Sequence, residues 1–189
     1  MSIADEELIT SHQSGDPDAF QELVRRSLTP VYNFVYSYLH DDADTEDATQ
    51  ETFLRAWKHL GRFTSGKKWK PWLFTIAKNV AFDHLRKKKG VPFSYLENEE
   101  QETSFSESIV DTEPLAHELF DNAQYAASLT KATSSLRPEY YSVIMLHYHQ
   151  ELTFEEIAGI LGIPMNTAKS WHRRALRELR VLLKSLAPK

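Results

Sequence analysis

The 189-residue sequence contains no cysteine and only six glycines. Without cysteine there is no disulfide framework, thiolate nucleophile or cysteine-based zinc site, which fits a reducing compartment. Asn-Gly and Asp-Gly hairpin turns and long alternating segments are also missing, so strand signals are absent. No apolar run approaches the roughly 20 residues of a spanning helix, and the acidic start Met1–Glu7 lacks the order of a secretory signal. These absences predict an all-α, soluble, cytoplasmic protein without membrane insertion.

Patterns that carry enzyme chemistry are missing as well. The eight histidines are scattered, no Ser-His-Asp order or paired-carboxylate site stands out, and there is no Gly-rich phosphate loop. His147 and His149 are two residues apart and would point to different faces of a helix, so surface or partly packed histidines explain them better than a metal site. We therefore expect no catalytic residue, metal or cofactor, and a protein that is not an enzyme.

The net charge of −5 hides a strongly segregated pattern. Residues 1–54 hold 12 acids and 2 bases, whereas residues 55–90 hold 11 bases and one acid. Nine acids and no Lys or Arg follow in 91–124, and residues 166–189 hold 7 bases and one acid. Because phosphate contact depends on the field within about 8–10 Å, two basic blocks favour nucleic-acid binding despite the acidic total. A solvated helix face explains either block equally well when it is taken alone.

The acidic segment after residue 90 has the composition of a linker. It carries Pro92, Pro114, many Ser and Glu residues and no sustained 3.6-residue stripe. It divides the chain into two small helical domains, 1–90 and 120–189, with a flexible acidic linker over 91–119. Within the C-terminal domain, a scaffold helix is expected to begin near Leu136 and to end near Glu151.

The C-terminal domain contains the most specific local pattern. Thr153 and Glu156 form a capping box before an apolar stripe, and Gly162 stands where a left-handed residue ends a helix. Pro164 then suits the first turn of a second helix that runs to about Leu183. Two helices joined by so short a turn predict a helix-turn-helix, whose second helix offers polar and basic side chains to DNA. The alternative is an ordinary helical hairpin with a basic exposed face.

One expected helix of the N-terminal domain has two contrasting faces. Asp44 is expected to cap a helix that runs to about Leu60, with a core stripe formed by Thr49, Thr52, Phe53, Ala56, Trp57 and Leu60. The opposite face of this helix is acidic and amide-rich, and it carries one leucine, Leu54. Such a face is usually solvated, but it also suits docking of a basic helical partner.

A basic loop interleaved with aromatics follows over residues 62–72, and a helix is expected from Trp72 to Lys89 with apolar residues on both faces. Two apolar faces mean either burial on both sides or a partner on one. Lysines among aromatic rings suit single-stranded nucleic acid, in which bases stack on rings while lysines follow phosphates. Alternatively, Trp69 and Trp72 anchor the core.

These residues resemble a known family in three places. Asp44–Trp57 resembles the polymerase-docking segment of extracytoplasmic-function (ECF, group IV) sigma factors of the sigma-70 family. Trp72–Asn79, followed by Asp83 and Arg86, is similar to their promoter-melting, −10-reading helix.

The third match lies in the C-terminal domain. Leu161–Pro164 with Thr167–Ser170 and Arg173–Ala175 resembles the family's −35-reading helix-turn-helix. All three matches occur in the family's order and spacing. The resemblance implies a sigma2-like helical bundle and a sigma4-like domain that bring RNA polymerase to particular promoters.

The resemblance also implies roles for individual residues. Those expected to bind core polymerase are Asp47, Gln50, Glu51, Leu54 and Lys58. Those expected at the −10 element are Arg62, Phe63, Lys67, Lys68, Trp69, Lys70, Lys78, Asn79 and Arg86. Those expected at the −35 element are Asn166, Thr167, Lys169, Ser170, His172, Arg173, Arg174 and Arg177. The loop over 64–70 would capture a flipped base of the non-template strand.

The implied partners are the coiled coil of the polymerase's largest subunit, its flap region, promoter DNA and an anti-sigma factor. The acidic linker would thread the RNA-exit region and mimic nucleic acid there. Trp171 and His172 depart from the residues common in relatives, which leaves the base preference at −35 open. Two rival functions are a free-standing helix-turn-helix regulator and a helical adaptor that binds polymerase or an anti-sigma factor without initiating.

Overall fold

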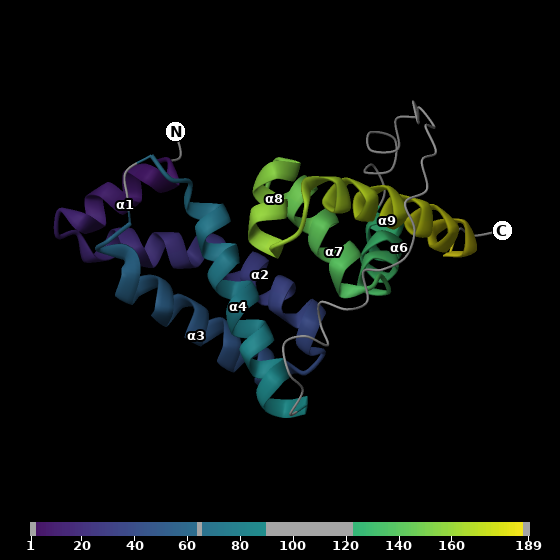
Figure 1. Cartoon of the computed structure of the whole chain (residues 1–189), viewed down its shortest axis with the longest axis horizontal. Coiled ribbons are helices and arrows are strands. Elements are labelled where there is room, and N and C mark those ends of the chain that lie inside the picture. The colour runs from purple at the N-terminus through teal and green to yellow at the C-terminus, as the bar shows by residue number, and fades with distance from the viewer. Residues whose placement is uncertain (1–2, 64–65, 90–122, 187–189) are drawn as a thin grey trace.

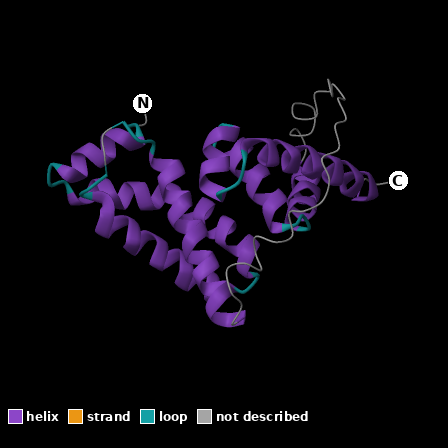
Figure 2. Ribbon diagram, in the orientation of Figure 1, coloured by secondary structure: helices purple, strands orange, loops and turns teal. Residues whose placement is uncertain are grey.

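A computed structural model describes residues 3–63, 66–89 and 123–186 of the chain. Within these ranges every regular element is helical, which confirms the all-α prediction (Figure 2). The elements are α1 (Asp5–Gln13), α2 (Pro17–Leu39), α3 (Asp42–Leu60), α4 (Trp69–Lys89), α6 (Ala123–Ser134), α7 (Pro138–Ile144), the π-helical turn η1 (Met145–His149), α8 (Phe154–Leu161) and α9 (Met165–Leu186). The predicted linker, 91–119, lies outside the described residues.

The N-terminal helices begin where the local sequence caps them. Asp16 accepts the backbone N–H of Asp18 at 3.0 Å, and Pro17 occupies the first position of α2. The Asp41 carboxylate accepts the N–H of Asp44 at 3.0 Å, so α3 begins at Asp42 and the prediction that Asp44 is its cap was wrong. Helix α4 likewise begins one turn earlier than predicted, at Trp69, with Pro71 in its first turn, where a missing N–H costs no helical bond.

Helix α4 lies at the centre of the molecule (Figure 1). It packs against α2 and α3 of its own bundle and against α8 of the C-terminal half. Leu73, Phe74, Ala77, Val80 and Ala81 are buried in the resulting core. Apolar residues on both faces of this helix are therefore explained by burial within the chain.

The helix-turn-helix forms as its sequence predicts. Glu156 donates its N–H to the Thr153 hydroxyl at 3.3 Å, and its carboxylate accepts the N–H of Thr153 at 2.8 Å, so both halves of the capping box are present. Gly162 ends α8 with φ of 74°. Along α9, Ala168, Ala175 and Leu179 are buried, so the opposite face of the helix is left to solvent.

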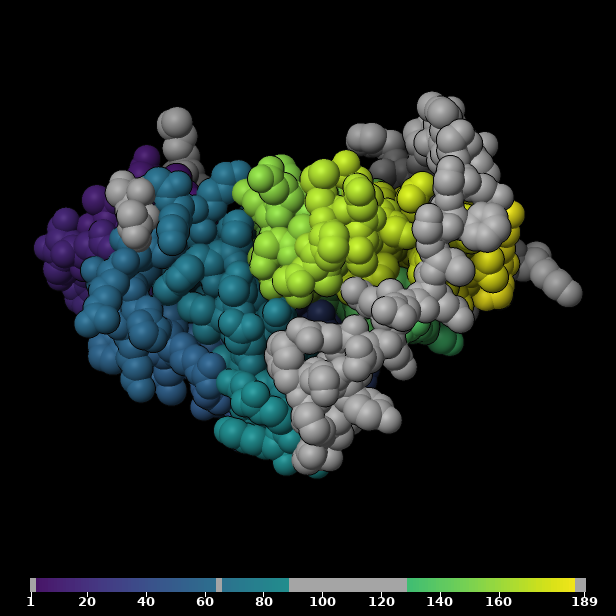
Figure 3. Space-filling view, viewed as in Figure 1, coloured from purple at the N-terminus to yellow at the C-terminus, as the bar shows by residue number. Residues whose placement is uncertain are grey.

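The two halves of the chain touch directly. In the space-filling view the surface of α8 and the start of α9 lies directly against α4 (Figure 3). Helix α7 packs against α2, where the hydroxyl oxygens of Ser142 and Tyr38 lie 2.8 Å apart. One buried apolar cluster contains residues of both halves, among them Leu73 and Ile157.

Candidate polymerase-binding and DNA-binding surfaces

The predicted polymerase-docking residues lie on α3. Asp47, Gln50, Leu54 and Lys58 are exposed, and 56% of the Leu54 side chain is open to solvent. An exposed leucine encircled by polar side chains has the composition expected at the centre of a binding patch.

Glu51, the fifth predicted docking residue, is only half-exposed because it binds its own fold. Its carboxylate lies 3.1 Å from the ring Nε2 of His84 and accepts hydrogen bonds from the Arg55 guanidinium, which also reaches Asp83 at 3.2 Å. Burial alone would raise the pKa of Glu51, but the hydrogen bonds from His84 and Arg55 hold it below its ordinary value. Glu51 thus ties α3 to α4 beneath the exposed face.

Trp57 was assigned to the core stripe from the sequence, and this assignment was wrong. Its side chain is 54% exposed, whereas Thr52, Phe53, Ala56 and Leu60 are buried as predicted. Trp57 lies one turn beyond Leu54, and residues three apart on a helix are neighbours. The two large apolar side chains therefore extend one exposed face, a relation that the spacing itself could have revealed.

The predicted −10 residues divide into exposed and packed groups. Arg62, Lys67, Lys68, Asn79 and Arg86 are exposed, and Arg86 also pairs with Asp83 at 2.7 Å. Lys70 and Lys78 are half-buried, and their ammonium groups donate to the backbone carbonyls of Gln150 and Leu161 in the C-terminal half. Residues 64 and 65 of the expected base-capturing loop lie outside the described residues.

Two aromatic residues expected to contact the −10 strand are instead core residues. Trp69 is fully buried, and its indole N–H donates to the Ser27 hydroxyl at 3.3 Å. Phe63 is 9% exposed and packs edge-on against Trp72, with ring centroids 5.1 Å apart. Neither ring offers a face on which a base can stack, so the alternative interpretation of Trp69 as a core anchor describes its position.

The predicted −35 residues occupy the first half of α9. Asn166, Lys169, Arg173, Arg174 and Arg177 are exposed, and Thr167 and Ser170 are half-buried. The N-terminal turns of this helix therefore present short polar groups and cations on one solvent-facing side, which is the arrangement that a major groove accepts.

His172 is half-buried and lies in an aromatic cluster with His147, Tyr148 and Phe154. Its Nε2 lies 3.1 Å from the Tyr148 hydroxyl, and its ring stacks on Tyr148 with centroids 5.6 Å apart. It also meets the rings of His147 and Phe154 edge-on. Burial, and to a smaller extent His147, lowers the pKa of His172 to about 4. A neutral, half-buried ring in this position joins η1 to α9, and its assignment as a base-reading side chain stays a prediction.

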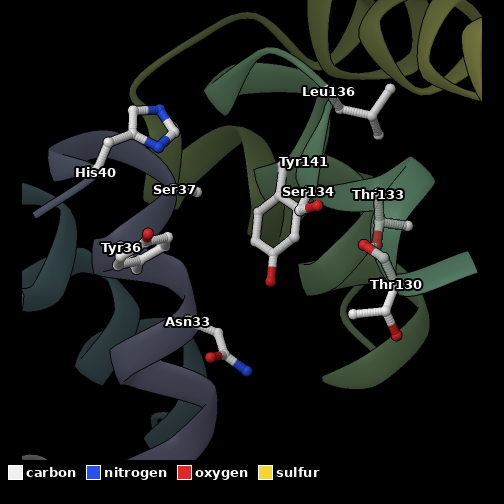
Figure 4. A pocket seen from close by; sticks show the side chains of 9 residues that line it. All are labelled: Asn33, Tyr36, Ser37, His40, Thr130, Thr133, Ser134, Leu136 and Tyr141. Atoms are coloured by element: carbon white, nitrogen blue, oxygen red, sulfur yellow. Dashed lines mark hydrogen bonds between the residues drawn. The ribbon is translucent and has the colours of Figure 1, made fainter. Parts of the chain in front are cut away.

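A pocket of about 190 Å³ opens where α2 faces α6 and α7 (Figure 4). Helix α2 contributes Asn33, Tyr36, Ser37 and His40, and the other wall is lined by Thr130, Thr133, Ser134, Leu136 and Tyr141. Its lining is almost uncharged and rich in hydroxyl groups. Because the two walls come from different halves of the chain, the pocket exists only while these halves are in contact.

Neither a metal site nor a membrane span emerges from the described ranges. They contain no group of three or more His, Asp or Glu side chains close enough to hold a metal ion. No helix among them combines the length and the apolar content that crossing a bilayer requires.

The fold defines a two-part helical protein with a helix-turn-helix, and comparisons with known proteins specify its family. The family model for sigma-70 region 2 matches residues 23–91, and that for sigma-70 region 4 matches residues 126–179. The ECF RNA polymerase sigma factor SigW of Bacillus subtilis is 33% identical over 178 residues, covering 92% of this chain and 94% of SigW. The RNA polymerase sigma factor CarQ of Myxococcus xanthus is 32% identical, with 92% and 94% covered.

The chain therefore belongs to the family of ECF RNA polymerase sigma factors, and it directs promoter-specific transcription initiation. Solved structures agree. The sigma factor RpoE, in complex with the anti-sigma factor NepR from Bartonella quintana, is 27% identical with a TM-score of 0.61, covering 87% of this chain and 96% of RpoE. CnrH, solved with the cytosolic domain of CnrY, shares the fold at 24% identity and a TM-score of 0.60, with 97% and 99% covered.

Proposed function

We propose that this sigma factor docks on core RNA polymerase through the exposed face of α3, formed by Asp47, Gln50, Leu54 and Lys58 and extended by Trp57. The observation that carries this proposal is the exposure of Leu54 and Trp57 side by side on a polar helix. Interfaces concentrate their binding energy in a few aromatic and aliphatic anchors that lose water on association. The coiled coil of the polymerase's largest subunit is the partner for this face.

The first half of α9 reads the −35 duplex in this proposal. Asn166, Lys169 and Ser170 reach base edges, while Arg173, Arg174 and Arg177 bind phosphates. Support comes from the exposure of the cations on one side of a helix that follows a tight turn. His172 supports this helix through its ring contacts with Tyr148 and Phe154.

The −10 strand follows the cations before and along α4. Arg62, Lys67, Lys68, Lys70 and Lys78 bind phosphates, while Asn79 and Arg86 complete the polar surface. Trp69 and Phe63 hold these groups in place from the core. The protein acts in the cytoplasm by binding alone, without a catalytic group or cofactor.

Two further partners belong to this proposal. The flap region of the polymerase holds the C-terminal domain, and the predicted linker 91–119 passes through the RNA-exit region between the domains. An anti-sigma factor is a partner as well, since the relative RpoE was solved with one.

Run-off transcription from a library of promoter fragments, followed by sequencing of the transcripts, tests the function. The purified chain with core polymerase should give specific products, and Gln50→Ala with Leu54→Ala should abolish them while leaving the unfolding temperature unchanged. The same products with the double variant at wild-type yield would contradict the assignment of the α3 face.

A further inference from the structure

The pocket between α2 and the C-terminal half has the lining of a small-molecule site. Helix α2 forms one wall, and α6, α7 and the turn between them form the other. Tyr36 and Tyr141 contribute an aromatic ring from each wall, and the Tyr141 hydroxyl points into the space between them (Figure 4). A ligand in this pocket would therefore touch both halves of the chain and would find an aromatic surface on each side.

The serine and threonine hydroxyl groups of the lining can only accept hydrogen bonds from a ligand. Ser37, Ser134 and Thr133 each donate to a backbone carbonyl three or four residues earlier, at 2.7, 3.0 and 2.9 Å respectively. A carbonyl has no proton to give, so the single proton of each hydroxyl is used within its own helix. The lone pairs of these three oxygens remain, and they require donors from a ligand.

Tyr141 and Asn33 supply donors in the same pocket. Neither the Tyr141 hydroxyl nor the Asn33 carboxamide has a hydrogen-bond partner among the residues that the structure describes. Burial raises the pKa of the half-buried Tyr141, so its hydroxyl keeps its proton at neutral pH. Asn33 adds two N–H donors and one carbonyl acceptor. A ligand that fits both walls must therefore donate and accept hydrogen bonds at several points.

The charge and the size of the pocket restrict the ligand further. None of the described residues that line it is Lys, Arg, Asp or Glu, so an ion would lose water there without gaining a counter-charge. Its volume of about 190 Å³ lies below the roughly 300–1,000 Å³ of pockets for drug-sized molecules. These properties select a neutral molecule of about one ring.

We propose that this pocket binds a neutral polyol of the size of one sugar ring, held between α2 and the α6–α7 wall. Each hydroxyl of a polyol both donates and accepts, which matches acceptors at Ser37, Thr133 and Ser134 and donors at Tyr141 and Asn33. The C–H faces of such a ring pack on aromatic side chains. Because the ligand touches both walls, it stabilises their contact by mass action. This site lies apart from the surfaces proposed for polymerase and DNA.

Titration of the full-length chain with three probes, D-glucose, D-galactose and myo-inositol, tests the proposal. Amide NMR shifts report binding, and the expected dissociation constant for so few non-hydrogen atoms is about 1–10 mM. At least one probe should give saturable shifts on α2 and on α7 together. No saturable shift from any of the three, or shifts confined to one wall, would overturn the proposal.

Two charged relatives of glucose test the requirement for a neutral ligand. D-glucuronate carries a carboxylate and D-glucosamine an ammonium group on nearly the same ring. Since the pocket offers no counter-charge, each should bind at least about tenfold more weakly than the best neutral probe. Equal affinity of D-glucuronate and D-glucose would refute a site for neutral polyols.

Substitutions in the lining show whether the described groups hold the ligand. Tyr141→Phe keeps the ring and removes the hydroxyl donor, and the exposed Asn33→Asp removes two N–H donors at constant shape, so each should weaken binding by up to about tenfold. The matched control is Tyr140→Phe, because Tyr140 packs beside Arg137 and does not line the pocket. Wild-type affinity in both lining variants would contradict the proposal, whereas the control should bind as wild type.

Failure of this inference can be distinguished from failure of the proposed function. The titrations use neither polymerase nor DNA, and Tyr141 and Asn33 lie outside the proposed polymerase and DNA surfaces. A chain that binds none of the probes but initiates transcription with core polymerase would refute the polyol site alone.

Discussion

At the scale of single residues, His172 shows how packing sets the charge state of a side chain. In the sequence of α9, His172 is followed directly by Arg173 and Arg174, yet its ring lies against Tyr148, His147 and Phe154. Burial lowers its pKa from 6.5 to about 4, so the folded protein keeps the ring neutral at a pH where an unfolded chain would protonate it.

This difference predicts a loss of stability in acid. Below about pH 6.5 the unfolded chain takes up a proton that the folded chain refuses until pH 4, so the free energy of unfolding falls across this window. The contribution is at most about 3 kcal/mol and is reduced by solvent screening at a half-buried site. Urea unfolding at pH 7 and pH 5 should show a smaller loss for His172→Phe than for wild type. The exposed control His149→Phe should behave as wild type, and an unchanged pH dependence in His172→Phe would contradict the lowered pKa.

Trp69 gives a second prediction at this scale. Because the ring is buried and its N–H is bonded to Ser27, Trp69→Phe should lower the free energy of unfolding by about 1–3 kcal/mol. The same change at the exposed Trp57 should cost less than about 0.5 kcal/mol. Thermal unfolding of both variants measures the difference. A Trp69→Phe variant of wild-type stability but weakened affinity for single-stranded DNA would restore the base-stacking interpretation.

What could be predicted from the sequence at this scale depended on periodicity. Ala168, Ala175 and Leu179 are buried along one face of α9, where small and apolar residues recur at helical spacing in the sequence. Trp57 was predicted to be buried and is exposed, whereas Trp69 was predicted to contact DNA and is buried. A tryptophan suits both a core and a binding surface, and only the neighbouring helices decide between the two. Exposure of an aromatic side chain is a tertiary property that helix spacing indicates only weakly.

At the scale of elements, the helix start that is fixed by two mutually bonded residues was predictable, and the start that is fixed by a single capping residue was not. The side chains of Thr153 and Glu156 each bond the backbone N–H of the other residue, and α8 begins directly after Thr153. The start of α3 offered four closely spaced acids, Asp41, Asp42, Asp44 and Glu46, any of which has the chemistry of a first turn. The choice of Asp41 follows from His40, which ends α2 in a left-handed conformation directly before it.

The exposed face of α3 makes a prediction about Trp57. Removal of an aromatic anchor from the centre of an interface typically weakens binding by a factor of ten or more. Trp57→Ala should therefore weaken the affinity for core polymerase at least about tenfold at unchanged stability, as measured by fluorescence anisotropy of the labelled chain. His59→Ala is the matched control, since His59 is exposed on the same helix but away from Leu54. Equal affinities of the two variants would remove Trp57 from the docking face.

Helix α9 makes a prediction about salt. Each phosphate contact releases about 0.9 counterion, so Arg173→Ala with Arg174→Ala should reduce the slope of log affinity against log salt by about 2. Duplex binding by the holoenzyme, titrated at several salt concentrations, gives this slope. Lys184→Ala, near the other end of the same helix, should leave it unchanged. A wild-type slope in the double arginine variant would show that these side chains do not contact phosphates.

At the scale of the whole molecule, the order of the three motifs identified the family, but the arrangement of the domains could not be read from them. The apolar residues on both faces of α4 were equally consistent with a partner and with internal burial. The structure resolves this ambiguity through α8, which is separated from α4 in sequence by the whole acidic segment. Contacts at such a sequence distance leave no periodic signature, so the packing of α8 on α4 could not be predicted from the sequence.

Family membership also accounts for parts of the chain that the two rival functions leave unexplained. A free-standing helix-turn-helix regulator leaves residues 44–90 without a role, whereas region 2 of sigma-70 matches this stretch directly. An adaptor that never initiates would not require two DNA-reading surfaces. Both surfaces act together only if polymerase holds them on one promoter, because tethering of two weak sites raises their effective concentration.

The central claim is that this chain works only as a subunit of RNA polymerase, and co-elution with the purified core enzyme at low salt tests it most directly. We expect the wild-type chain to elute with core polymerase in a one-to-one complex and the Leu54→Ala, Trp57→Ala variant to elute alone. A wild-type chain that elutes free of the polymerase under these conditions would contradict the account, whatever affinity α9 shows for DNA.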